Sequence, residues 1–533
     1  MNAERYIHLI NLHLILPSGE LSVLTSLHLD TSTGLICSPP SPSAPSNHTR
    51  TIDLDGKWVS PGMIDIQING AFGIDLSEYQ SEEDYIQGVR KMSKGLCEGS
   101  VTSFLPTIIS QTKEKYHSIL PVLSKLPSLF RYQGGLSTPL GWHLEGPFIH
   151  PKKVGCHPPI NLMSALKGFI SLEEIYGGNN VDSKPNVEEA GEFVKMITLA
   201  PDVKGILHVI PDLKLRGWKI SLGHTNASTE QALEGIRRGA TLLTHLFNAM
   251  PPLNHREPGI IGLLGLPISS SAMKVIRPSI SQRVKSTIST PLTRSHAPTR
   301  VPALIDEDKE DHEGEDDPSG VDGIPSDDLL SDQITSNPLE INIDQLNFSA
   351  KSGGFHPSLE ITIPSDSTTP SEPHTPYNES LARVERPFFS IIADGIHVHP
   401  LAVSMAYNAH PQGCILVSDA MHMLDPSLPD GIHPWREGTF IEKRNGGITL
   451  SGTNTLAGSI LPLSEAVINL SRFTGISIPE AVVCATYNPA LALGGGIRER
   501  VGLNIGCWAD LVVWNEDGIK GVWKSGKKVW SKE

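Results

Sequence analysis

The middle of the chain alternates between short apolar segments and amphipathic segments, and this alternation limits the fold more than any other feature. In the segment 81–99, apolar residues recur at helical spacing behind Ser81 and Asp84, which have the spacing of a capping box. Helices are also predicted for 228–239 and 477–494. Buried strands are predicted for 101–107, 141–146, 218–224, 240–248, 388–398 and 413–420. Strand–helix alternation over this length predicts an α/β fold, a (β/α)8 barrel of the TIM type.

The two ends of the chain differ from this middle. Both look like short β-strands separated by turns. Because chain termini commonly lie close together, they predict one small β-sandwich domain formed by both termini. The predicted boundaries are 1–60 and 495–533 for the β-sandwich domain, 61–266 and 387–494 for the two parts of the barrel, and 267–386 for an insertion.

The segment 267–386 interrupts the alternation. It is rich in Ser, Pro, Thr and Asp, and its acidic run Asp306–Asp317 holds nine acids and one lysine. Such a composition cannot bury enough apolar surface to offset the entropy lost on ordering. We therefore predict a mostly disordered insertion between two barrel strands. Its use is open between a solvated spacer and a regulatory or phosphorylated segment.

The charge and cysteine content exclude several classes of protein. The chain has 43 Lys and Arg against 58 Asp and Glu, a net charge of −15, of which the acidic run contributes −8. This balance argues against binding to nucleic acid or to an anionic membrane. The six cysteines form no CxxC pair, and no apolar run reaches membrane-spanning length. We therefore expect a cytoplasmic protein with reduced thiols.

Polar side chains stand at the ends of five predicted strands, namely Glu145, His224, His245, His397 and Asp419. In a barrel of this type, active-site groups gather where strands end and loops begin. Each residue alone is more often structural, but five such ends in one chain favour a shared site. Two imidazoles and a carboxylate suit a divalent transition metal, zinc first. A separate carboxylate, Asp419, could take a proton from water at such a metal.

A second group of residues has the character of an anion site. The segment 245–259, HLFNAMPPLNHREPG, offers Asn248, the backbone near Ala249, and Arg256. Arginine suits phosphate because its planar fork forms paired, charge-assisted hydrogen bonds. A loop salt bridge is the alternative explanation for Arg256.

Seven short motifs in the same order make the chain similar to a known family. The chain resembles the N-acetylglucosamine-6-phosphate deacetylases of the amidohydrolase superfamily, over residues 59–460, and its C-terminal strands resemble that superfamily's returning β domain. Only the insertion falls outside the match. The motifs are PGMIDIQINGAFGIDLS, HLEGPFIHPKKVGCHPP, SLGHTNAS, THLFNAMPPLNHREPG, ADGIHVHP, LVSDA and GTNTLAGS.

The resemblance implies a role for each matching position. It implies metal ligands, a general base that later protonates the departing amine, a residue that polarises the acetamide carbonyl, contacts to the sugar phosphate, and a loop beside the substrate. By this resemblance the metal ligands are Glu145, His224 and His245, the general base is Asp419, and the residue that polarises the carbonyl is His157, which also touches the substrate. The contacts to the sugar phosphate are Asn248, Ala249, Arg256 and His397. The loop beside the substrate is Leu456, Ala457 and Gly458. In relatives the arginine comes from the other subunit, so the resemblance also implies a homodimer.

One departure from the wider superfamily bears on the metal. Many members carry His-x-His at the first strand and bind two metals, whereas this chain has Gln67-Ile68-Asn69. Amides are poor zinc ligands beside imidazole. We therefore expect one divalent metal per chain, with zinc as the first candidate by the chemistry of its ligands, and a weak second site at Gln67 and Asn69 is left open.

The resemblance implies metal-dependent hydrolysis of N-acetyl-D-glucosamine 6-phosphate to D-glucosamine 6-phosphate and acetate, in amino-sugar catabolism. Two alternatives stay open. One is another amidohydrolase reaction, such as cyclic-amide hydrolysis or deacetylation of a different sugar. The other is a sugar-phosphate-binding protein without activity. His143 and His150 have no assigned role. Lys152 and Lys153 are either ordinary charged residues of a loop or residues that attract an anionic substrate.

Overall fold

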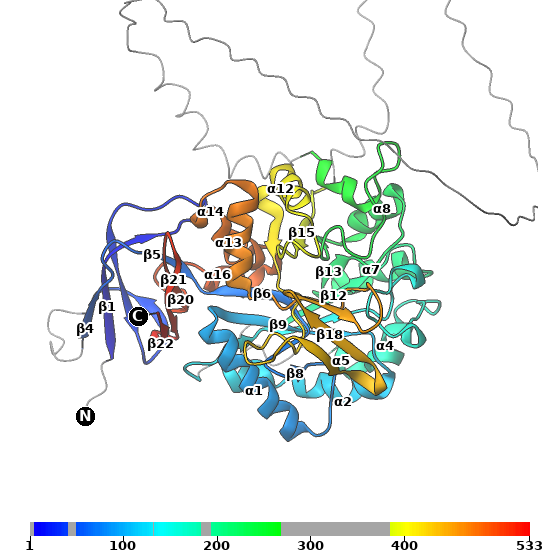
Figure 1. Cartoon of the computed structure of the whole chain (residues 1–533), viewed down its shortest axis with the longest axis horizontal. Coiled ribbons are helices and arrows are strands. Elements are labelled where there is room, and N and C mark those ends of the chain that lie inside the picture. Colours follow the sequence, from blue (N-terminus) through cyan, green and yellow to red (C-terminus); the bar gives the residue numbers. More distant parts are fainter. Residues whose placement is uncertain (1–4, 41–48, 132, 183–192, 268–383, 533) are drawn as a thin grey trace, which may run out of the picture. The chain divides into compact units, whose positions relative to one another are not determined.

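Eight parallel strands form the barrel (Figure 1). The computed structural model describes residues 5–40, 49–131, 133–182, 193–267 and 384–532. Backbone hydrogen bonds from Asp419 N to Gln67 O (2.9 Å) and from Asn69 N to Ala420 O (2.8 Å) join the last strand to the first. The predicted TIM-type barrel is therefore confirmed. Its strands are β6 (Met63–Ile68), β9 (Val101–Ile109), β11 (Gly141–Glu145), β12 (Val194–Leu199), β13 (Lys219–Leu222), β14 (Leu242–Leu243), β15 (Phe388–Ile391) and β16 (Cys414–Leu416).

Helices follow the strands as the alternation predicts. Ser81 caps the first of them by accepting a hydrogen bond from Asp84 N. The apolar faces of most of these helices pack against the strands in one large core, whereas α15 and α16 pack into a second, smaller core. The helices are α1 (Glu82–Glu98), α2 (Lys113–Leu123), α3 (Leu126–Phe130), α4 (Ile170–Tyr176), α5 (Gly178–Asp182), α7 (Ile206–Leu215), α8 (Thr229–Arg238), α12 (Pro400–Ala409), α13 (Leu463–Thr474), α14 (Ile478–Val483), α15 (Tyr487–Leu493) and α16 (Gly495–Arg500).

Two predicted elements differ from the structure. The segment 477–494 is two helices, α14 and α15, rather than one. Pro489 explains the break, because its ring cannot share a continuous helix with the carbonyl four residues earlier, whereas it is tolerated in the first turn of α15. The strand predicted over 240–248 is only two residues long, since His245 and Phe247 have φ angles of 31° and 77°, outside the β region.

Strands from the two ends of the chain form one further sheet, drawn in blue and red in Figure 1. The strand β5 pairs antiparallel with β20, with Val59 opposite Val513. Leu9, Leu29 and Trp523 belong to the core that both ends share. The predicted β domain built from both termini is thus confirmed, while its exact boundaries stay a prediction. The strands are β1 (Tyr6–Leu14), β2 (Thr25–Asp30), β3 (Leu35–Cys37), β4 (Thr49–Asp53), β5 (Trp58–Pro61), β20 (Leu511–Asn515), β21 (Gly518–Lys524) and β22 (Lys527–Ser531).

A small antiparallel sheet after β16 was not predicted. It consists of β17 (Gly431–Pro434), β18 (Phe440–Arg444) and β19 (Gly447–Leu450). The half-buried carboxylate of Asp75 holds the loop between β17 and β18, accepting hydrogen bonds from Trp435 Nε1 (3.2 Å) and Arg436 Nε (2.9 Å). This sheet packs beside the loop that follows it, which lines the site described below.

Two further predictions concern the insertion and the absence of membrane-spanning segments. The predicted insertion 267–386 lies outside the described residues, apart from position 267 and positions 384–386. Within the described ranges, no helix combines the length and apolar character needed to cross a membrane.

Candidate metal and active site

Three side chains from three strands of the barrel, β11, β13 and β14, meet at one end of the barrel. Glu145 is the last residue of β11, and His224 and His245 follow β13 and β14. The Oε1 atom of Glu145 lies 3.3 Å from His224 Nε2 and 3.1 Å from His245 Nε2, and the two Nε2 atoms are 3.0 Å apart. All three residues are buried. One carboxylate and two imidazoles at this spacing form a group that can hold a metal ion.

Backbone conformation turns several of these residues into the barrel mouth. His224, His245 and Asp419 have φ angles of 47°, 31° and 46°. Non-glycine residues rarely adopt such angles, and each costs about 1–3 kcal/mol unless the surroundings impose it. All three lie two or three residues after the end of a barrel strand, so the parallel sheet supplies that constraint. Such strain concentrated at one barrel mouth is typical of a functional site.

Hydrogen bonds and charges fix the chemical state of the cluster. His224 Nδ1 donates to the carbonyl of Lys153 at 2.7 Å, so Nε2 is the ring nitrogen that faces Glu145. Burial raises the pKa of Glu145, but His224 and His245 outweigh burial and hold that pKa well below its ordinary value. Burial lowers the pKa of His245, yet its contact with Glu145 raises the pKa overall. A divalent cation would satisfy all three ligand atoms, so this donor set fits a metal.

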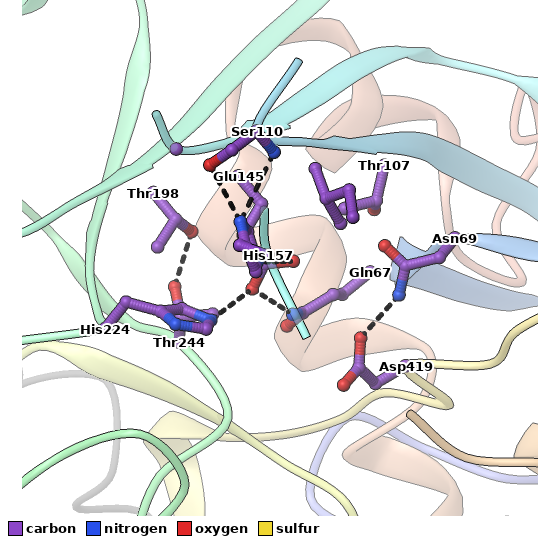
Figure 2. A network of polar contacts seen from close by, with 12 residues as sticks. Gln67, Asn69, Thr107, Ser110, Glu145, His157, Thr198, His224, Thr244 and Asp419 are labelled. Carbon is purple, nitrogen blue, oxygen red and sulfur yellow. Dashed lines mark hydrogen bonds and ion pairs between the residues drawn. The ribbon is translucent and has the colours of Figure 1, made fainter. Parts of the chain in front are cut away.

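His157 lies beside the cluster in a defined tautomer. Its Nδ1 accepts a hydrogen bond from Ser110 N (3.3 Å) and pairs with Ser110 Oγ (2.8 Å), as Figure 2 shows. Nε2 therefore carries the proton, 3.9 Å from Glu145 Oε2. Burial, then repulsion from His224, lowers the pKa of His157 well below its ordinary value. His157 is thus a neutral hydrogen-bond donor that faces the cluster.

Two amides of the first strand orient the two carboxylates of the site (Figure 2). Gln67 Nε2 donates to Glu145 Oε1 at 2.9 Å, and Asn69 Nδ2 donates to Asp419 Oδ1 at 2.8 Å. Burial and the charge of Glu145 raise the pKa of Asp419 to about 6. Both amide nitrogens are therefore occupied as donors, while the amide oxygens of Gln67 and Asn69, the atoms that could bind a metal, are buried without a hydrogen-bond partner among the described residues. The weak second metal site at Gln67 and Asn69 thus stays open.

A cavity of about 280 Å³ opens over the cluster. Most residues singled out in the sequence line it. They are Glu145, His157, His224, His245, Asn248, Ala249, His397, Asp419, Leu456 and Gly458. Two others do not line it: Arg256 is exposed in its loop, and Ala457 is buried in the core of the small sheet. A larger cleft of about 620 Å³, lined by Arg131, Trp508 and Lys524 among others, contains none of the predicted site residues.

Known proteins are similar to this chain in sequence and in fold. No family model matches the chain. The N-acetylglucosamine-6-phosphate deacetylase of Bos taurus is 31% identical over 486 residues, covering 90% of this chain and 85% of that protein. The enzyme of the same name from Danio rerio is 30% identical over 487 residues, covering 90% and 86%. The chain belongs to the N-acetylglucosamine-6-phosphate deacetylase family. The fold agrees with the crystal structure of the Pasteurella multocida deacetylase, with a TM-score of 0.63 and 20% identity over 98% of this chain and 99% of that one.

The positions that the deacetylase family implies for the sugar phosphate lie on the loop after β14 and beyond β15. Asn248 N donates to His245 O at 2.9 Å, and Ala249 has a φ angle of 51°, so the loop is tightly folded. His397 Nδ1 contacts Asp394 Oδ2 at 2.6 Å, which leaves Nε2 as the free ring nitrogen of His397. The loop after β14 and the imidazole of His397 therefore both present polar groups to the cavity.

Several contacting residues were missed in the sequence. Ser110 follows β9 just as Glu145 ends β11, so the rule of polar strand ends could have found it. Asp394 lies three residues before His397 in the same loop, a spacing at which the two side chains can form an ion pair. Lys153 was singled out in the sequence for its charge, but the contact of its carbonyl with His224 had no sequence signal. His143, which had no assigned role, is buried below the cluster and contacts Thr198 Oγ1 at 2.7 Å.

Proposed function

We propose that this chain hydrolyses N-acetyl-D-glucosamine 6-phosphate to D-glucosamine 6-phosphate and acetate, as a step of amino-sugar catabolism. The observation that carries the proposal is the Glu145, His224 and His245 cluster beside Asp419, in one cavity of a chain that belongs to the deacetylase family. The substrate is a small sugar phosphate. The six cysteines are all free and agree with a cytoplasmic setting.

One divalent metal per chain would be held by Glu145, His224 and His245. Zinc is the first candidate, because a set of two nitrogens and one oxygen suits it and three protein ligands leave a position open. When bound, such a metal supplies Lewis-acid chemistry, activating water and polarising an amide carbonyl. Gln67 and Lys153 orient the ligands through Glu145 Oε1 and His224 Nδ1.

Asp419 is the proton-transfer group of the proposed reaction. Its carboxylate takes a proton from the attacking water and then delivers it to the sugar nitrogen as the amide bond breaks. Asn69 binds one carboxylate oxygen, which leaves the other free for this transfer. His157 donates a hydrogen bond from its Nε2–H to the acetamide oxygen, where negative charge develops, and keeps that proton. The atoms balance, since water adds across the amide and acetate leaves.

The remaining residues would bind the sugar phosphate. Asn248, the backbone of Ala249 and His397 hold the phosphate end, and Leu456 and Gly458 line the cavity beside the sugar. Ala457 lies behind this wall, so its part would be played by its backbone or by packing. Holding the phosphate far from the reacting carbon orients the amide through remote binding energy.

Arg256 leads to a proposal about assembly. Its side chain is exposed and lies outside the cavity of its own chain, so we infer that it serves the cavity of a second copy in a homodimer. An Arg256→Ala and an Asp419→Asn subunit would then complement each other, because a mixed dimer contains one intact site. Refolding the two variants together at equal amounts should restore about one quarter of wild-type activity. Activity no higher than the sum of the separate variants would contradict the exchange of Arg256 between subunits.

The test of the function is acetate release with protein of known metal content. We expect fast turnover of N-acetylglucosamine 6-phosphate, at least about a hundredfold above N-acetylglucosamine in kcat/KM, because unpaired polar groups in a site penalise a substrate that lacks their partner. Equal turnover of both sugars would remove the phosphate contacts from the proposal. Absence of turnover with metal bound would favour a binding protein or a different N-acyl substrate.

A further inference from the structure

The cavity has few positive charges of its own. Among the described residues that line it, Glu145 and Asp419 are acidic, and Lys152 and Lys153 are the only lysines, with no arginine. A phosphate dianion entering this cavity meets two carboxylates, whose charge the metal would offset, and needs a cation at the opposite end. Among the described residues that line the cavity, apart from its histidines, only these two lysines offer such a cation, and another subunit is the alternative source.

Lys153 and Lys152 have different environments. Lys153 is half-buried, and its Nζ donates to Met250 O at 3.0 Å, immediately after the loop residues Asn248 and Ala249. Lys152 is exposed, and within the described part of the chain its backbone N–H alone has a partner, His150 Nδ1 at 3.0 Å. One ammonium is therefore fixed beside the loop after β14, whereas the other is free in solvent.

The bond to Met250 O uses one of the three N–H groups of the Lys153 ammonium. Two N–H groups remain for a ligand. They project from a side chain that lines the same cavity as Asn248 and Ala249. Fixing the ammonium in advance removes most of the entropy cost of ordering a lysine on a ligand. A charge-assisted hydrogen bond from this position is then about twice as strong as a neutral one.

We propose that Lys153 is a specificity residue that binds the substrate's phosphate from within the same subunit. This inference rests on the proposed function and deepens it. It predicts that phosphate recognition persists in part when no second copy supplies Arg256. Lys153 also contributes the carbonyl that orients His224, so its side chain fixes a loop that touches both the metal ligand and the phosphate end.

The experiment compares Lys153→Met, Lys153→Arg and the neighbouring control Lys152→Met with the wild type. For each protein, kcat and KM are measured with N-acetylglucosamine 6-phosphate and with N-acetylglucosamine, and the dissociation constants of glucosamine 6-phosphate and glucosamine are measured by calorimetry. For Lys153→Met we expect phosphorylated ligands to bind at least about tenfold more weakly, while their unphosphorylated counterparts change by less than about threefold. Lys153→Arg should recover part of the loss, and Lys152→Met should change either ligand by less than about threefold.

Two results would overturn the inference. Equal losses for both kinds of ligand in Lys153→Met would make Lys153 a positioning residue for His224 alone. Losses in Lys152→Met as large as in Lys153→Met would make the effect one of general charge. A different result would contradict the proposed function, namely a wild-type protein that binds glucosamine 6-phosphate but releases no acetate. In that case the binding data still decide the role of Lys153.

Discussion

The Asp419→Asn variant should lose about a thousandfold in kcat on N-acetylglucosamine 6-phosphate, with KM changed by less than about threefold. An amide cannot accept the water proton or return it to the leaving amine. The shape of the side chain is nearly unchanged, and its Oδ1 can still accept the hydrogen bond from Asn69. The substrate should therefore bind as before while proton transfer fails.

The pH dependence of turnover follows from the same carboxylate. Burial and the charge of Glu145 raise the pKa of Asp419 to about 6 in the metal-free protein. The base acts when deprotonated, so activity is present above this pKa and falls about tenfold per pH unit below it. A bound cation stabilises the carboxylate and lowers the pKa, so the acid limb of kcat against pH should have its midpoint at or below about 6. A midpoint well above that value would assign the limb to another group.

A neighbouring buried carboxylate provides the control. Asp65 Oδ1 accepts hydrogen bonds from Gln67 N and Ser418 N, and burial raises the pKa of Asp65 to about 7. In Asp65→Asn the amide oxygen can keep both hydrogen bonds, so kcat should fall by less than about tenfold. Near-full turnover of Asp419→Asn, or an equal loss in both variants with unchanged melting temperatures, would remove Asp419 from the proton-transfer role.

The barrel and its polar strand ends could be predicted because they depend on local pattern and on one general rule. Apolar runs and helical spacing are visible in the sequence, and the carboxyl ends of parallel strands meet at one mouth. Glu145, His224, His245 and Asp419 are separated by up to 274 positions, yet this rule places them together. The family resemblance then supplied His157, which lies in a loop rather than at a strand end.

The contacts that orient these groups could not be predicted in the same way. The amides of Gln67 and Asn69 are visible in the sequence, but the carboxylates that receive their hydrogen bonds lie on strands far along the chain. The pairing of Ser110 with His157 and the carbonyl of Lys153 under His224 also depend on loop geometry. Propensity and periodicity carry no information about such distances, so only the folded structure reveals them.

The small sheet was missed for a different reason. The turn Asn445–Gly446 between β18 and β19 is a strong hairpin signal, and both residues have positive φ angles. Its strands are only four or five residues long and carry charged residues such as Lys443 and Arg444, so they lack an apolar run. A search for hairpin turns, rather than for apolar strands, would have found this sheet beside the cavity.

Replacing Glu145 with glutamine should abolish metal binding as well as turnover. An amide oxygen is a far weaker ligand than a carboxylate, and only two imidazoles would then remain. We expect the metal content to fall from about one ion per chain to less than about a tenth, and kcat to fall at least about a thousandfold. Elemental analysis after dialysis against a weak chelator measures the first effect, and acetate release measures the second.

A stability readout separates loss of the ligand from damage to the fold. Metal that binds only the folded protein stabilises it by about 4 kcal/mol when its concentration is a thousand times Kd, so adding zinc should raise the melting temperature of metal-free wild type. It should leave that of Glu145→Gln unchanged. His150→Asn is the matched control, because His150 caps the turn at Lys152 from the same loop and lies outside the cluster. That variant should keep both the metal and the zinc-dependent stabilisation.

The comparison of Glu145→Gln with chelated wild type then decides what Glu145 does. If Glu145 acts only by holding the metal, the two proteins should have the same residual activity, and excess zinc should rescue the chelated wild type alone. A variant that retains about one metal per chain yet loses turnover would show that His224 and His245 suffice for binding. The carboxylate would then act on the substrate or on His157, whose Nε2 lies 3.9 Å from its Oε2. Because His157 is held neutral by burial and by its imidazole neighbour, that outcome would also change the state in which His157 meets the acetamide.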